Sequence, residues 1–81
     1  MEPEWHARYA TYEDVDSFIA DLPALAIIRQ TFMADHYVAV IEAVDGTLVI
    51  GDPGSGLRLM SFADFAKIWR RQAIVLEQTV L

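Results

Sequence analysis

Residues 36–56 read HYVAVIEAVDGTLVIGDPGSG, and this stretch predicts the structure on which the rest of the fold depends. Apolar and β-branched residues fill 36–43 and 47–51, and the Asp45-Gly46 pair between them is typical of a hairpin turn. Asp52, Pro53 and two glycines then end the second run. The stretch predicts a β-hairpin with His36 and Asp52 at the open ends of its two strands.

The length of the hairpin loop decides whether His36 and Asp52 can meet. A two-residue loop at Asp45 and Gly46 would set Asp52 opposite Ala39, and its side chain would point away from the face that carries His36. In that geometry the two residues are an ordinary turn initiator and an ordinary strand start.

A three-residue loop, residues 44–46, would instead set Asp52 opposite Val38. Asp52 and His36 would then share a face, roughly 5–8 Å apart at Cβ and within reach of a hydrogen bond. A glycine at the last loop position, Gly46, suits this geometry because the three-residue loop needs a positive φ there. In that arrangement Asp52 could orient His36 and stabilise its charged form, as the third member of a catalytic triad does.

The remaining segments predict helices and further strands around the hairpin. Residues 1–10 show no clear period, and we expect a flexible arm there. Thr11 and Asp14 resemble a capping box before an amphipathic helix over 12–21, which Pro23 ends. Residues 24–30, 57–59 and 73–78 predict strands, residues 31–35 a loop, and Ser61 a cap for a second helix. The expected fold is α+β, a small curved antiparallel sheet of about four or five strands with two helices.

The second helix is expected to place aromatic residues in the core. Phe62, Phe65 and Trp69 lie at helical spacing on one face, which favours core packing over ligand stacking. Arg58, Lys67, Arg70 and Arg71 favour a solvated face and helix end.

Composition limits the function classes. The chain has 81 residues, which predicts a single domain with a thin stability margin. Its 54% hydrophobic content predicts apolar surface left over for docking, while six basic residues and a net charge of −6 argue against a nucleic-acid partner. The sequence holds no Cys, which excludes disulfides and a cysteine nucleophile within these residues.

The sequence contains no clear signal for targeting or for metal binding. The start, MEPEWHARY, lacks the basic and apolar regions of a signal peptide, and no apolar run reaches membrane-spanning length, so we expect a cytoplasmic chain. His6 with Glu2 and Glu4 has no recognised metal-site spacing, and we expect neither a metal nor a cofactor.

Residues 36–69, HYVAVIEAVDGTLVIGDPGSGLRLMSFADFAKIW, resemble the C-terminal half of the bacteriocin-processing cysteine peptidases. The likeness rests on His36 with Tyr37, on Asp52-Pro53 with Gly56, and on a helix carrying Ser61, Phe65 and Trp69, followed by the strand at 73–76. Residues 11–28, TYEDVDSFIADLPALAII, resemble the helix and strand that come before the histidine strand in that family. Residues 11–81 would then be a single peptidase-like half domain.

The resemblance implies a papain-like fold and a role in cutting double-glycine leader peptides, often beside a peptide-exporting ABC transporter. It implies His36 as general base and Asp52 as the orienting carboxylate. The family's nucleophilic Cys and oxyanion-hole glutamine belong to an N-terminal helical half with no match here. Ser17, Ser55 and Ser61 are each better explained by a local role than as a substitute nucleophile.

Two functions of different class follow. The first is a non-catalytic peptide- or protein-binding module derived from such a peptidase, and we favour it for the chain alone, from which no peptidase activity is expected. The second is one subunit of a split cysteine peptidase, supplying His36 and Asp52 to a partner chain that carries the Cys. Self-association is a further possibility, since an exposed sheet face on a half domain would tend to pair with itself.

Overall fold

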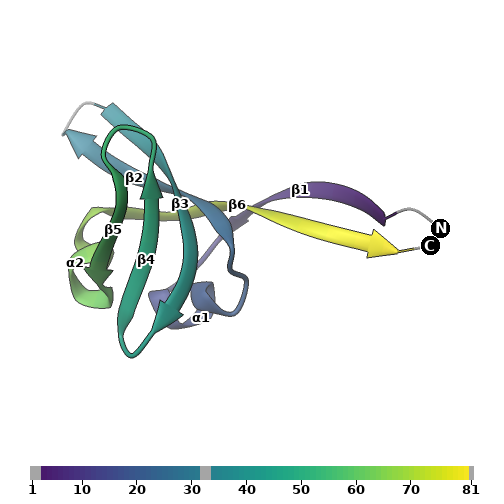
Figure 1. Ribbon diagram of the computed structural model, residues 1–81, viewed down its shortest axis with the longest axis horizontal. Coiled ribbons are helices and arrows are strands. Elements are labelled where there is room, and N and C mark those ends of the chain that lie inside the picture. Colours follow the sequence, from purple (N-terminus) through teal and green to yellow (C-terminus); the bar gives the residue numbers. More distant parts are fainter. Residues whose placement is uncertain (1–2, 32–33, 81) are drawn as a thin grey trace.

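The computed structural model describes residues 3–31 and 34–80 as six strands and two short helices (Figure 1). In chain order these are β1 (Pro3–Thr11), α1 (Val15–Ile19), β2 (Ala24–Thr31), β3 (Ala34–Val44), β4 (Thr47–Asp52), β5 (Gly56–Ser61), α2 (Phe62–Ile68) and β6 (Trp69–Val80). The α+β class and the two helices are confirmed. The expected strand number is wrong, since the sheet has six strands in the order β1-β6-β2-β3-β4-β5, with all neighbours antiparallel.

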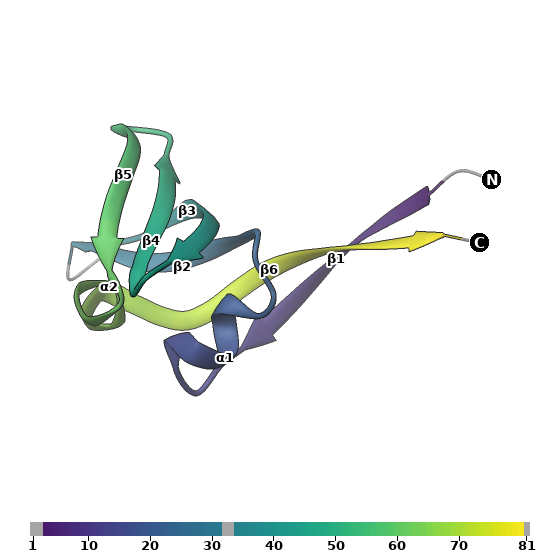
Figure 2. The ribbon, with the colours of Figure 1, turned by 60° about the horizontal axis from the view of Figure 1, so that its bottom comes forward.

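The additional strand comes from the N-terminus, where we expected an arm. Residues Pro3 to Thr11 pair residue by residue with Val80 to Gln72 of β6. Most of β1 and the end of β6 run out beyond the body of the sheet as a two-stranded ribbon (Figures 1 and 2). Trp5, Ala7 and Tyr9 alternate with Glu4, His6 and Arg8, a period of two that is typical of a strand and that the expectation of an arm overlooked.

Two helix boundaries also differ from the expectation. The helix α1 begins only at Val15, and its N-cap is Asp14, whose Oδ1 accepts a 2.9 Å hydrogen bond from the Ser17 backbone N–H. Thr11 belongs to β1, so the proposed capping box does not form. At the other helix the Ser61 cap is confirmed, but Trp69 has extended backbone and begins β6 instead of ending α2.

Both helices lie on one face of the sheet, which we call the inner face (Figure 2). The core lies between this face and the helices. Trp69 packs with Phe18 of α1 and Phe65 of α2 at ring-centroid distances of 4.6 and 5.2 Å, and so joins the two helices to β6. Phe62 lies beside the core and is only partly buried. The fully buried side chains of the body include Phe18, Val38, Val40, Leu48, Ile50 and Phe65.

The β3–β4 hairpin has a two-residue loop. Val44 pairs with Thr47, and the turn residues Asp45 and Gly46 have φ of 49° and 75°. Two consecutive positive φ values are the signature of a type I′ turn, for which Asp-Gly is a preferred pair. Of the two loop lengths considered, the two-residue loop is the one that forms, and Gly46 takes its positive φ as the second residue of the type I′ turn.

The Gly46→Ala variant should be destabilised by about 1–2 kcal/mol, because a Cβ at positive φ strains the backbone. Space is not the cause, since a Cβ built at Gly46 meets no atom within 4 Å. The matched control is Asp45→Gly, which removes a Cβ from positive φ at the neighbouring position and should not destabilise the fold. Chemical denaturation of both variants measures this, and equal stability of Gly46→Ala and wild type would contradict the turn assignment.

Candidate functional site

His36 and Asp52 are brought together on the inner face, at the edge of the core. His36 lies near the start of β3 in the same alternation as Val38 and Val40, which are buried. Asp52 is the last residue of β4, in the same alternation as Ile50. The His36 Nε2 atom lies 3.1 Å from Asp52 Oδ1, and the two side chains are 24% and 11% exposed.

A β-bulge at Ile41 makes this approach possible. The β3–β4 register pairs Glu42 with Val49 but Val40 with Ile50, so Ile41 is an extra residue with no partner on β4. Such a bulge shifts all later pairs by one residue. Ala39 therefore opposes Gly51, and continuing the register by one residue sets Asp52 opposite Val38.

The expectation that only a three-residue loop could unite His36 and Asp52 is therefore corrected. The two-residue loop alone would have sent the Asp52 side chain to the other face. The bulge at Ile41 supplies the missing one-residue shift in the middle of the strand.

The surroundings of Asp52 favour its ionised form. The Gly54 backbone N–H donates to Asp52 Oδ1 at 2.7 Å, and this hydrogen bond, followed by the one from His36, lowers the pKa of Asp52 below its ordinary 3.8. Arg58 Nη1 lies 3.9 Å from Asp52 Oδ2 and acts in the same direction. Asp52 is thus an anionic acceptor near neutral pH.

An anionic carboxylate fixes the proton on the imidazole. Because it can only accept hydrogen bonds, the ring must donate its Nε2–H to Asp52. In the neutral ring the remaining nitrogen, Nδ1, then carries a lone pair and can take a proton from another group. The arrangement has the geometry of a general base with an orienting acid, a pair that needs a nucleophile beside Nδ1 to perform covalent chemistry.

Arg58 and the Gly54 amide are part of this site, and the sequence reasoning did not find them. Arg58 was expected on a solvated face, but Asp52 pairs with Gly56 in the β4–β5 ladder, so Arg58 lies two residues further along on the same face. The sequence did contain a signal for the Gly54 contact. An Asp side chain often accepts a hydrogen bond from the backbone N–H two residues later, which forms an Asx turn.

The three serines have local roles in the structure, as expected. Ser61 Oγ accepts from the Asp64 N–H at 3.1 Å, and Ser17 Oγ donates to the Asp14 carbonyl at 3.0 Å. Ser55 donates its backbone N–H to the Asp52 carbonyl in the turn after β4. None of these contacts links a hydroxyl to His36.

The residues considered for a metal site do not form one in the part of the chain described. His6 Nε2 lies 3.6 Å from Glu4 Oε2 on the exposed ribbon, while Glu2 lies outside the described residues. Residues 3–31 and 34–80 contain no group of three or more His, Cys, Asp or Glu side chains placed to hold a metal ion. The two described helices, of five and seven residues, are too short to cross a membrane.

Comparison with known proteins gives one family. Residues 7–80 match the model of the Peptidase C39 family. The chain is 32% identical over 76 residues to the pediocin PA-1 transport/processing ATP-binding protein PedD of Pediococcus acidilactici, an alignment that covers 88% of this chain and 10% of PedD.

Solved structures of the ComA peptidase domain share the fold. The Streptococcus mutans domain in complex with a small-molecule inhibitor superposes with a TM-score of 0.76 at 27% identity, covering 90% of this chain and 63% of that one. A structure of the domain from Streptococcus ComA, described as a bi-functional ABC transporter involved in a quorum-sensing pathway, gives 0.75 at 27% identity, covering 89% and 56%. The chain thus spans about six tenths of the solved peptidase domains.

The Asp52→Asn variant should change the tautomer of His36. In the wild type the neutral ring carries its proton on Nε2, because Asp52 accepts it. An Asn side chain can donate to the same nitrogen, so the Nδ1–H form should gain population. Long-range ¹H–¹⁵N correlation spectra distinguish the two tautomers, and His6 on the ribbon is the internal control. An unchanged His36 pattern would contradict the hydrogen bond.

Acid unfolding should report the lowered pKa of Asp52. A carboxylate with a lowered folded-state pKa stabilises the fold above its ordinary value of 3.8, and this contribution is lost as the pH falls through the folded-state pKa. Asp52→Asn should therefore lose stability near neutral pH and show a flatter dependence below about pH 4. Glu42→Gln, on the exposed face of β3, is the control for removing one charge, and equal slopes for wild type and Asp52→Asn would contradict this assignment.

Proposed function

The chain belongs to the peptidase C39 family, and we propose that it supplies the general base and orienting acid of a cysteine peptidase site. In this proposal His36 is the base, Asp52 orients it, and the Cys nucleophile comes from outside these 81 residues. The hydrogen bond from His36 Nε2 to Asp52 Oδ1 is the observation that carries the proposal. A chain retained only for binding has no need to keep this pair aligned.

The proposed chemistry follows from the proton positions. A thiol placed beside Nδ1 gives its proton to His36, and the thiolate attacks the carbonyl carbon of the scissile peptide bond. The imidazolium, stabilised by Asp52, then protonates the leaving amine nitrogen as the C–N bond breaks. A water molecule, deprotonated by His36, hydrolyses the thioester and restores the thiol.

Arg58 has a supporting part in this proposal. Its guanidinium lies 3.9 Å from the second oxygen of Asp52, an ion-pair distance, while Gly54 and His36 share the first oxygen through hydrogen bonds. The two hydrogen bonds orient the carboxylate toward the imidazole, and the nearby positive charge of Arg58 favours its ionised form. Arg58 and the Gly54 amide are thus proposed as positioning groups for the base.

The proposed substrate class is the precursor of an exported peptide. PedD is named for the transport and processing of pediocin PA-1, and ComA is described as a bi-functional transporter in quorum sensing. The resemblance in sequence adds that the cut follows a double-glycine leader. The Cys-bearing segment can belong to a partner chain or to a longer polypeptide that includes these residues.

Reconstitution tests the proposal. The chain is mixed with a Cys-bearing helical segment taken from the part of a C39 relative that has no counterpart here. We expect cleavage of a double-glycine precursor and faster alkylation of the Cys by iodoacetamide. The His36→Ala variant should reduce cleavage by about 10²–10⁴-fold, the usual contribution of a general base. Asp52→Asn should also slow cleavage.

Asp35→Asn is the matched control, because Asp35 precedes His36 in the chain but its side chain pairs with Arg70 at 3.0 Å. It should leave the rate unchanged. A reconstituted peptidase whose rate does not change in His36→Ala would sink the proposal.

A second candidate is a non-catalytic module that binds peptide or protein, and two observations favour it. The 81 residues hold no Cys, and several large hydrophobic side chains, among them Leu57 and Leu59 at 74%, are exposed. If this candidate holds, precursor binding measured by calorimetry survives both His36→Ala and Asp52→Asn, and no helical segment restores cleavage.

A further inference from the structure

We propose that this chain forms a homodimer through the face of the sheet opposite the helices, which we call the outer face. The proposal goes beyond the peptidase function, because it concerns a surface that does not include His36 or Asp52. It rests on the strand register, on the distribution of charge, on a hollow in the surface and on the exposed area.

The strand register places the exposed large hydrophobic residues on the outer face. Side chains that oppose each other in neighbouring strands share a face. Ile74 opposes Leu25, Leu25 opposes Ala39, Ala39 opposes Gly51, and Gly51 opposes Leu57. Because the inner-face positions between them are buried under the helices, this row lies on the uncovered side of the sheet.

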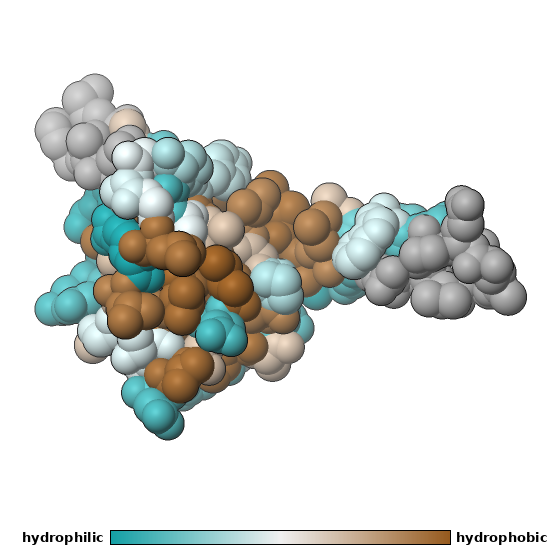
Figure 3. All heavy atoms as spheres, viewed as in Figure 1, coloured by the Kyte–Doolittle hydropathy of each residue, from teal (hydrophilic) through white to brown (hydrophobic). Residues whose placement is uncertain are grey.

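Residues two positions along a strand from this row point to the same face, so they also belong to the outer face. Tyr37 lies two residues before Ala39, and Leu59 two residues after Leu57. The Ile41 side chain is there as well, since its Cδ1 would lie 3.7 Å from a Cβ at Gly51. In Figure 3 hydrophobic residues accordingly gather over β4 and β5 and continue toward the base of the β1–β6 ribbon.

The ribbon extends the same face. Tyr9 opposes Ile74, Ala7 opposes Leu76, and Trp5 lies two residues further along. Trp5, Tyr9 and Leu76 are 62%, 57% and 57% exposed. A two-stranded ribbon is marginally stable in water unless it packs on something, so these side chains need a partner surface.

Charges on the ribbon lie on its other side. Glu4, His6 and Arg8 alternate with Trp5 and Ala7, so they point to the inner face. Arg8 there pairs with Glu77 at 2.6 Å. The ribbon is therefore apolar on one side and charged on the other. In the body of the sheet Glu42, which opposes Val49, is a charged residue that does lie on the outer face.

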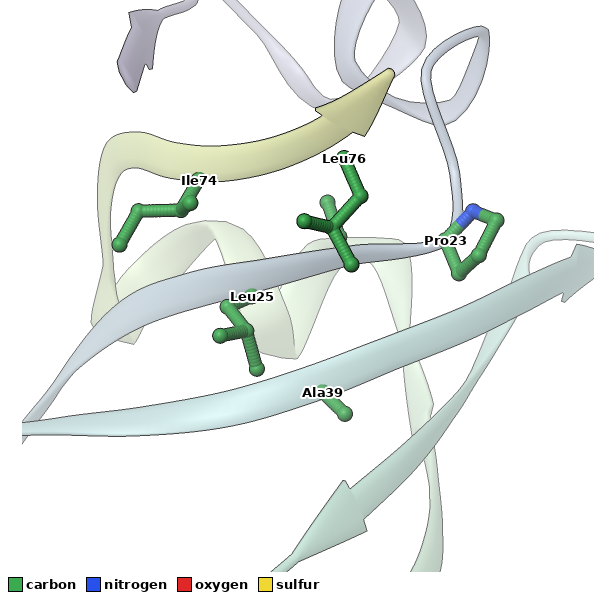
Figure 4. Close-up of a pocket in the computed structure, with 6 residues that line it drawn as sticks. Pro23, Leu25, Ala39, Ile74 and Leu76 are labelled. Atoms are coloured by element: carbon green, nitrogen blue, oxygen red, sulfur yellow. The ribbon is translucent and has the colours of Figure 1, made fainter. Parts of the chain in front are cut away.

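The outer face also contains a hollow of about 150 Å³ (Figure 4). Leu25, Ala39, Ile74 and Leu76, from β2, β3 and β6, line it, together with Pro23. The volume fits one large apolar side chain. Protruding leucines and a nearby hollow on one surface are self-complementary, as a two-fold interface requires.

The exposed area is large enough for a stable dimer. The structure describes nine exposed large hydrophobic side chains with exposed fractions from 41% to 74%, and the register places each on the outer face. At roughly 150–250 Å² for an aromatic side chain and less for an aliphatic one, the exposed fractions together present on the order of 1,000 Å². A standard interface buries about 800 Å² per partner, and the largest apolar patch of a typical monomer is about 300–600 Å².

Sedimentation equilibrium of the full chain from micromolar to millimolar concentration tests the proposal. We expect a monomer–dimer equilibrium that tightens as salt is added, because salt screens the repulsion between two acidic chains without weakening apolar contact. Leu59→Lys and Leu76→Lys should each weaken the dimer at least about tenfold, since each puts a charge among the apolar side chains of the interface.

Ala66→Lys is the control, because Ala66 is exposed on α2 and the substitution makes the same change in charge. It should leave the dimer intact. Circular dichroism shows whether each variant is folded, and isotope-filtered NOEs in a mixed labelled sample should connect outer-face methyl groups across the dimer.

Three outcomes would overturn the proposal. They are a monomer at every concentration, a dimer as sensitive to Ala66→Lys as to Leu59→Lys, and a monomer that binds a precursor peptide or helical segment through Leu59 and Leu76. Loss of the dimer leaves the His36 tautomer and reconstituted cleavage as separate readouts, so failure here is distinguishable from failure of the peptidase proposal.

Discussion

The register of β3 against β4 is the constraint on which the rest of this structure depends. The type I′ turn starts the ladder, and the bulge at Ile41 shifts it by one residue. Because side chains alternate with a period of two, that single residue decides which side chains face the helices. With the bulge, His36 and Asp52 join the buried residues of both strands on the inner face.

The same alternation separates the two surfaces of the sheet. On the inner face the aromatic rings of Phe18, Phe65 and Trp69 hold the helices on the strands, and the core removes apolar area from water. On the outer face large hydrophobic side chains stay exposed beside charged ones such as Glu42. The high hydrophobic content of so small a chain thus supplies a buried core on one side of the sheet and exposed apolar side chains on the other.

Electrostatics link the turn after β4 to the histidine. The Gly54 amide, the His36 ring and the Arg58 guanidinium each act to keep Asp52 ionised, and an ionised Asp52 in turn keeps the proton of His36 on Nε2. The chemistry available at Nδ1 is therefore set by a backbone turn and a neighbouring strand. The local contacts of this turn thus explain how it acts on the histidine.

The sequence by itself determined the family resemblance, the hairpin, both helices and the choice of His36 and Asp52 as candidate residues, while it left open whether the two meet. These features depend on local periods, caps and turn residues, which a sequence displays directly. It also indicated apolar surface left over for docking.

Only the tertiary structure decided the rest. A bulge leaves no residue signal, because Ile41 is an ordinary strand residue until its partners are known. Residues Pro3–Thr11 become a strand only through β6, more than sixty positions away in the chain. Arg58 reaches Asp52 only because β5 lies beside β4. The bulge, the N-terminal strand and the Arg58 contact each depend on residues that are distant in the chain. The sequence of one segment does not tell which other segment will pair with it, or in which register.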